Sequence, residues 1–183
     1  ARDYYGGTKD LATLKAVQRT LQYCMEVQLK EAIATGYKME FNGDETEICQ
    51  AVNVTQAGTV MGGSICQADW SMSSIAVCAA SLDFYIKYLE ARGDDVANYR
   101  NGQTGTTLNL KTELANLLKA MDDDFWRTDV PEIPDGFHDA FRIKKTNAWP
   151  LRRTVNFTLM PVYFGTPYDP ARKAKDVSAM AHY

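Results

Sequence analysis

The sequence has no proline in its first 130 residues and only two histidines among 183 residues. Because proline interrupts helices, the proline-free part can hold long ones. Two histidines, His138 and His182, are too few for a multi-histidine metal site. No apolar run reaches the roughly 18 to 20 residues that a membrane-spanning helix needs. These absences predict a chain without a transmembrane segment and without a histidine-rich metal centre.

The sequence also lacks a strong charge of one sign. Its 20 basic and 23 acidic residues are intermixed and give a formal net charge of -3. Such a chain has no overall positive field to attract a nucleic acid, so we expect no DNA partner. A length of 183 residues with 45% hydrophobic residues is sufficient for one compact core with an appended arm.

Apolar residues recur at three- and four-residue steps in three segments, which is the pattern of amphipathic helices. The pattern predicts helices over 8–35, over 64–91, and from Thr106 or Thr107 to about residue 126. Gly36 and Gly93 follow the first two helices, as stop signals commonly do. The fold class is therefore mainly α, with a three- to four-helix bundle.

All six prolines lie from residue 131 onward, which predicts an extended arm after the bundle. We therefore divide the chain into a helical bundle domain over 1–126 and a proline-rich C-terminal arm over 127–183. Within the arm, the patterns predict a short helix over 136–143 and a short strand over 154–159. Asp169 and Pro170 suit the N-cap and first turn of a terminal helix.

Four cysteines are an even number, as two disulfides require. On one helix, Cys66 and Cys78 would lie roughly 18 Å apart along the axis, beyond the distance of about 7 Å that a disulfide spans. If the first two helices form an antiparallel hairpin, Cys24 falls level with Cys78, and Cys49 lies near Cys66. We therefore expect nested Cys24–Cys78 and Cys49–Cys66 bridges, which would indicate an oxidising compartment, an organelle lumen or secretion. Four free thiols packed as small apolar side chains are the alternative.

No pattern marks a catalytic, cofactor or metal site. Asp135, His138 and Asp139 suggest an acid–base group, but a lone histidine beside carboxylates is usually only hydrogen-bonded. No serine or cysteine stands in a nucleophile motif. The acidic run 122–124 lacks the spacing of a calcium-binding loop and is typical of a solvated helix end. We expect a non-enzymatic protein without cofactor or metal.

The arm is rich in aromatic and arginine side chains, which protein interfaces enrich. Aromatic side chains that fold back over the bundle are the alternative. Basic residues of the arm also suit a peripheral contact with anionic lipid headgroups. The predicted interface residues are Phe137, Phe141, Trp149, Arg152, Arg153, Tyr163, Phe164 and Tyr168.

Three functions are compatible with these features. We expect first an accessory or scaffold subunit that docks onto the protein subunits of a larger assembly through its arm and aromatic surfaces. The first alternative is a helical module that binds a small molecule or pigment in a pocket between helices. The second alternative is the coat protein of a filament or capsid, in which arms extend from a helical core.

Overall fold

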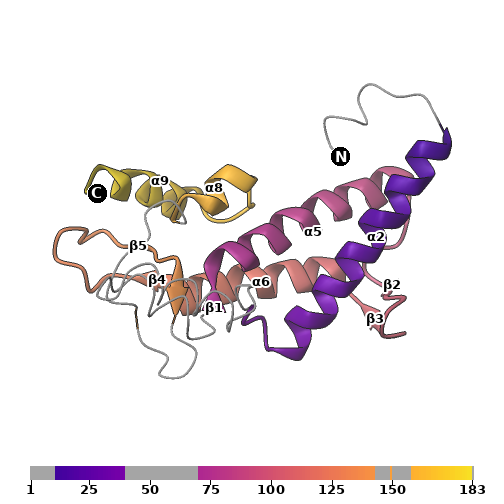
Figure 1. The fold of residues 1–183 in the computed structure, drawn as a ribbon, viewed down its shortest axis with the longest axis horizontal. Helices are drawn as coiled ribbons and strands as arrows, with labels where there is room; N and C mark the ends of the chain where they lie inside the picture. The colour runs from indigo at the N-terminus through magenta and orange to yellow at the C-terminus, as the bar shows by residue number, and fades with distance from the viewer. Residues whose placement is uncertain (1–10, 40–69, 143–148, 150–157, 183) are drawn as a thin grey trace, which may run out of the picture.

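The computed structural model describes residues 11–39, 70–142, 149 and 158–182. Over these residues the protein is mainly α-helical, as the sequence predicts (Figure 1). Helices α5 and α6 run side by side, and α2 lies across them. The bounds of these three helices are Leu11–Ala34 for α2, Met72–Arg92 for α5 and Leu110–Phe125 for α6.

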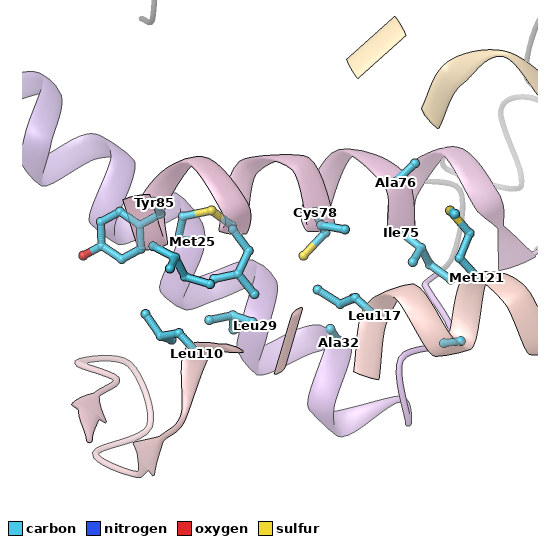
Figure 2. Close-up of a cluster of buried hydrophobic side chains, with 14 of the residues drawn as sticks. Met25, Leu29, Ala32, Ile75, Ala76, Cys78, Tyr85, Leu110, Leu117 and Met121 are labelled. Atoms are coloured by element: carbon cyan, nitrogen blue, oxygen red, sulfur yellow. The ribbon is translucent and has the colours of Figure 1, made fainter. Parts of the chain in front are cut away.

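The three helices share one apolar core, shown in Figure 2. Met25 and Leu29 enter it from α2, Ile75 from α5, and Leu117 and Met121 from α6, and each is almost completely buried. Burying one such side chain contributes about 1.5 to 3 kcal/mol. Apolar packing therefore holds the three helices together.

The ends of α5 and α6 follow from capping side chains. The Ser71 hydroxyl accepts a hydrogen bond from the backbone N–H of Ser74 at the start of α5. Gly93, in the left-handed conformation, ends α5 as predicted. Asn109 caps α6 and accepts from Lys111 and Thr112. The predicted cap at Thr106 or Thr107 is wrong, because strand β3 (Thr107–Leu108) intervenes and the helix begins only at Leu110.

Tyr37 connects the end of α2 to α6. It has a positive φ of 64°, which is uncommon for a residue other than glycine. Its backbone N–H donates to the carbonyl of Ala32, and its hydroxyl donates to Glu113 Oε2 at 2.7 Å. The Asn116 amide donates in turn to the Tyr37 hydroxyl at 2.8 Å. These bonds offset the backbone strain and fix α2 against α6.

The described residues also form short antiparallel strand pairs. The predicted helix over 136–143 is wrong, because two of these strands lie in that segment. Strands β5 and β6 occupy that segment instead. The backbone of β5 pairs with β4, and Gly136 adopts a φ of 82° that starts the strand rather than a helix. In the described part of the chain the strand pairs are β1 (Trp70–Ser71) with β6 (Phe141–Arg142), β2 (Tyr99–Arg100) with β3 (Thr107–Leu108), and β4 (Trp126–Arg127) with β5 (Phe137–His138).

The C-terminal arm folds onto the bundle as two helices, α8 (Met160–Phe164) and α9 (Pro170–Ala179), followed by a 3-10 turn, η1 (Met180–His182). Helix α8 packs against α5, and the Thr166 hydroxyl donates to the Ala76 carbonyl at 2.9 Å. The terminal helix is confirmed, with the Asp169 side chain as its N-cap. Most of the predicted strand over 154–159 lies outside the described residues. The domain boundary after residue 126 stays a prediction.

The predicted Cys24–Cys78 disulfide is absent from the structure, where both thiols are free. Cys24 is exposed on α2, whereas Cys78 is fully buried and points into the core (Figure 2). Cys24 therefore lies on the solvent-exposed face of α2, whereas Cys78 lies on the core face of α5. The prediction used only the positions of the two residues along their helices. Cys49 and Cys66 lie outside the described residues, so their bridge stays a prediction.

Candidate functional site

A groove of about 510 Å³ opens between α5, α2 and the end of α8. Leu21 of α2, Val77 and Phe84 of α5, and Phe164 of α8 give it an apolar lining. Asp83 and Lys87 also line it, and they form an ion pair with each other at 2.7 Å. Because these opposite charges neutralise one another, the groove suits an uncharged apolar group more than an ion.

Two aromatic side chains of α8 lie beside this groove and are accessible to solvent. Tyr163 is 81% exposed and Phe164 is 40% exposed. Their rings meet edge to face, with centroids 5.3 Å apart. Large exposed aromatic side chains next to a groove are typical of interaction sites. We call Tyr163, Phe164 and the groove the α8 surface.

The other predicted interface residues have different positions. Phe137 is completely buried and Tyr168 is 8% exposed, so neither presents an exposed surface to a partner. The half-buried Trp149 has the guanidinium of Arg142 at 4.1 Å and that of Arg127 at 4.7 Å from its ring centroid. Arg152, Arg153 and the side chain of Phe141 lie outside what the structure describes.

A buried polar cluster surrounds His138, which strand β5 places inside the protein. Its Nδ1 lies 2.9 Å from Asp176 Oδ2, and its Nε2 lies 3.0 Å from Asp122 Oδ1. Asp176, on α9, also accepts from the backbone N–H of His138 and from the Tyr168 hydroxyl, both at 2.8 Å. His138 and Asp176 are both 0% exposed. The cluster thus ties α6, β5 and α9 to one another.

Electrostatics favour the charged imidazolium in this cluster. Burial by itself lowers the pKa of His138, but the hydrogen bonds and negative charges of Asp122 and Asp176 outweigh it and raise that pKa above the usual value. For Tyr168, burial raises the pKa first and the charge of Asp176 adds to it. The tyrosine hydroxyl therefore stays protonated and donates a hydrogen bond to the carboxylate of Asp176.

This cluster differs from the acid–base group considered in the sequence. Asp139 does not pair with His138; its carboxylate accepts from Arg127 at 2.6 Å, and Asp135 is exposed. Asp122, from the run interpreted as a solvated helix end, is a partner of His138 instead. Both ring nitrogens and the Asp176 carboxylate are already occupied by internal partners. The arrangement is that of a buried ion-pair cluster whose members bind one another.

A second polar network fixes the β2–β3 hairpin against α2. The buried Glu26 Oε1 accepts from Tyr99 at 2.7 Å and from Gln22 at 2.9 Å. Burial opposes ionisation of Glu26, but these bonds, together with those from Gly102 and Gln103, lower its pKa below the usual value. The hairpin is therefore held by a carboxylate that is ionised near neutral pH.

Replacing Gly102 by alanine tests this network. A Cβ at position 102 would lie 2.8 Å from Glu26 Oε2, so the carboxylate must shift from its donors. We expect a loss of about 1 to 2 kcal/mol in the free energy of unfolding, measured by urea denaturation. In a Glu26→Ala background the same substitution should cost clearly less, because the displaced atom is gone. Equal costs in the two backgrounds would contradict the network.

The α8 surface is the candidate interaction site of the described residues. Over the described ranges, no cluster of three or more histidine, cysteine or acidic residues is placed to hold a metal ion. In the same part of the chain, no helix has the length and apolar character needed to cross a membrane. Comparisons with protein-family models, with curated proteins and with solved structures find no match for the chain.

Proposed function

We propose that this protein is a non-enzymatic accessory or scaffold subunit, which docks onto a larger protein assembly through the α8 surface. The observation that carries the proposal is the exposure of Tyr163 and Phe164 beside an apolar groove. The occupant that suits this groove is an uncharged apolar segment of a partner subunit, because Asp83 and Lys87 already neutralise each other. Aromatic residues next to grooves often supply most of the binding energy of an interface.

The non-enzymatic part of the proposal is supported by buried polar groups that form hydrogen bonds with other groups of the protein. His138, the buried histidine, has both ring nitrogens bound to carboxylates. Tyr99 is bound to Glu26 and Tyr85. A catalytic group needs a free position that faces substrate. His138 and Tyr99 are instead engaged with internal partners.

Co-fractionation of tagged variants from native extract tests the proposal. The tagged chain should elute in size-exclusion chromatography with a larger assembly. Replacing both Tyr163 and Phe164 by serine should weaken the association about tenfold or more and move the chain to the monomer position. The matched control replaces Ile33 and Val177, which are 40% and 51% exposed and do not line the groove. Elution of the unaltered chain as a free monomer would contradict the proposal.

The size of the groove favours one second candidate, a small-molecule or pigment-binding module. Its volume of about 510 Å³ lies in the range of small-molecule sites. The same purification distinguishes the two functions. A bound pigment would give absorbance outside the protein band, and its loss on replacing Val77 or Phe84 by a polar residue would place it in the groove.

A further inference from the structure

Both ring nitrogens of His138 must carry a proton to donate hydrogen bonds to the carboxylates that they face. Nδ1 lies 2.9 Å from an oxygen of Asp176, and Nε2 lies 3.0 Å from an oxygen of Asp122. A neutral imidazole has only one N–H, whereas the imidazolium has two. With a neutral ring, one nitrogen lone pair would face a carboxylate oxygen at hydrogen-bond distance. The geometry alone therefore selects the protonated form.

The charged groups around His138 come from every element packed against it. Asp122 comes from α6, and Asp176 from α9. Arg172 of α9 lies 3.5 Å from Asp122 Oδ1, and Arg127 of β4 is bound to Asp129 and Asp139. The guanidinium of Arg172 and the amine of Lys175 lie over the ring of Trp126, and that ring and the His138 ring are T-shaped, with centroids 4.9 Å apart. His138 is thus the cation placed directly between the two carboxylates.

We propose that His138 is a proton-gated latch for the C-terminal helix α9, closed while the imidazole is protonated and loosened when it loses its proton at raised pH. Loss of the proton leaves Asp176, which is 0% exposed, without its cationic partner. Deprotonation at Nε2 also removes the hydrogen bond from His138 to Asp122, and Arg172 then remains as the cationic partner of Asp122. Both changes weaken the attachment of α9 to β5 and α6.

Opening of the latch would uncover a separate apolar cluster. Ala179, near the end of α9, packs on Val130, Ile133 and Phe137, and these four residues form a cluster distinct from the main core. Among the described residues the cluster consists of these four side chains, so their packing by itself adds little to hold α9 in place. The buried polar contacts of Asp176 therefore contribute to the attachment of α9 beside the contacts of Arg172 and Lys175, and a change of one proton at His138 weakens that contribution. The raised pKa of His138 agrees with this assignment.

The sign of the pH effect follows from the protons bound. The closed form binds the proton more tightly than the open form, so the latch is strongest below the usual histidine pKa of about 6.5. Its strength falls as the pH rises from there through the raised pKa of the closed form. In that window the closing equilibrium constant falls about tenfold for each pH unit.

Hydrogen exchange of the full chain between pH 6 and pH 9 tests the latch. Protection factors, which correct for the intrinsic effect of pH on exchange, are measured for amides of α9 and for central amides of α5. We expect those of α9 to fall about tenfold per pH unit within the window, while those of α5 stay constant. Constant α9 protection over the whole range would overturn the proposal, as would an equal fall in both helices.

Two variants connect the effect to His138. Asp122→Asn keeps the shape of a half-exposed side chain and removes one of the two charges, so the fall in α9 protection should shift to lower pH. His138→Asn removes the titrating group, so α9 should be weakly protected at all pH values in this range. If His138→Asn fails to fold, the Asp122→Asn shift still decides. An unshifted profile in Asp122→Asn would overturn the proposal.

Discussion

Replacing Asp176 by alanine is expected to lower the free energy of unfolding by about 3 to 5 kcal/mol, the range for breaking a buried ion pair. The carboxylate is 0% exposed and accepts from the His138 ring, the His138 backbone and the Tyr168 hydroxyl. Its removal leaves the buried imidazolium with one carboxylate partner, Asp122, and leaves three donors without their acceptor. Urea denaturation followed by circular dichroism measures the loss.

The control for this prediction is the same substitution at Asp123. Its ion pair with Lys119 lies on the exposed face of α6, with 57% and 71% of the two side chains exposed. Exposed pairs are screened by water and salt, so Asp123→Ala should leave the denaturation midpoint nearly unchanged. If the two substitutions lowered the free energy of unfolding equally, the loss at Asp176 could not be attributed to the His138 cluster.

Replacing Gly136 by alanine is expected to cost about 2 to 5 kcal/mol, from left-handed backbone strain and overpacking together. Gly136 has a φ of 82°, and a Cβ there would lie 2.7 Å from Cζ2 of Trp126. The Trp126 ring cannot easily move away, because the His138 edge and the Arg172 guanidinium both contact it. The denaturation midpoint and the near-ultraviolet circular dichroism of tryptophan should both change.

Gly93→Ala separates the two contributions to that cost. Gly93 has a closely similar φ of 80°, but nothing lies within 4 Å of a Cβ built on it. This variant should therefore lose only the backbone part, about 1 to 2 kcal/mol. If Gly136→Ala costs no more than Gly93→Ala, the close contact with Trp126 does not constrain the fold.

The helices were the part of the fold that the sequence predicted best, because apolar periodicity reports directly which face is buried. The segment 136–143 shows the limit of that signal. Phe137, Ala140 and Phe141 have helical spacing, yet pairing of β5 with β4 decides the conformation there. Helix α8 had a readable signal that was missed: Pro161 lies in its first turn, and Gly165 ends it in the left-handed conformation.

The His138 cluster could not be predicted from sequence. His138 lies on strand β5, whereas its partners Asp122 and Asp176 lie 16 and 38 residues away, on α6 and α9. Only the folding of the arm back onto the bundle brings them together. The prediction of a Cys24–Cys78 disulfide was wrong for a similar reason. Helical rise gave the height of Cys24 and Cys78, but the face that each presents depends on how the helices cross.

The α8 surface was predicted only in part. Tyr163 and Phe164 were named as interface residues, and both are exposed. The same reasoning also named Phe137 and Tyr168, which are buried, because composition indicates that a segment is aromatic but not which side chains turn inward. The groove beside α8 depends on Leu21, Val77 and Phe84 from two other helices, so no local pattern could have shown it.

Site-specific photo-crosslinking in the native assembly tests the proposed docking most directly. A photoreactive phenylalanine analogue replaces Tyr163 in one variant and Val177 in another, since both side chains are exposed but only Tyr163 belongs to the α8 surface. The account predicts a discrete crosslink from position 163 to another protein subunit, and none from position 177. Crosslinks to that subunit from position 177 alone, or from neither position while the assembly stays intact, would contradict docking through the α8 surface.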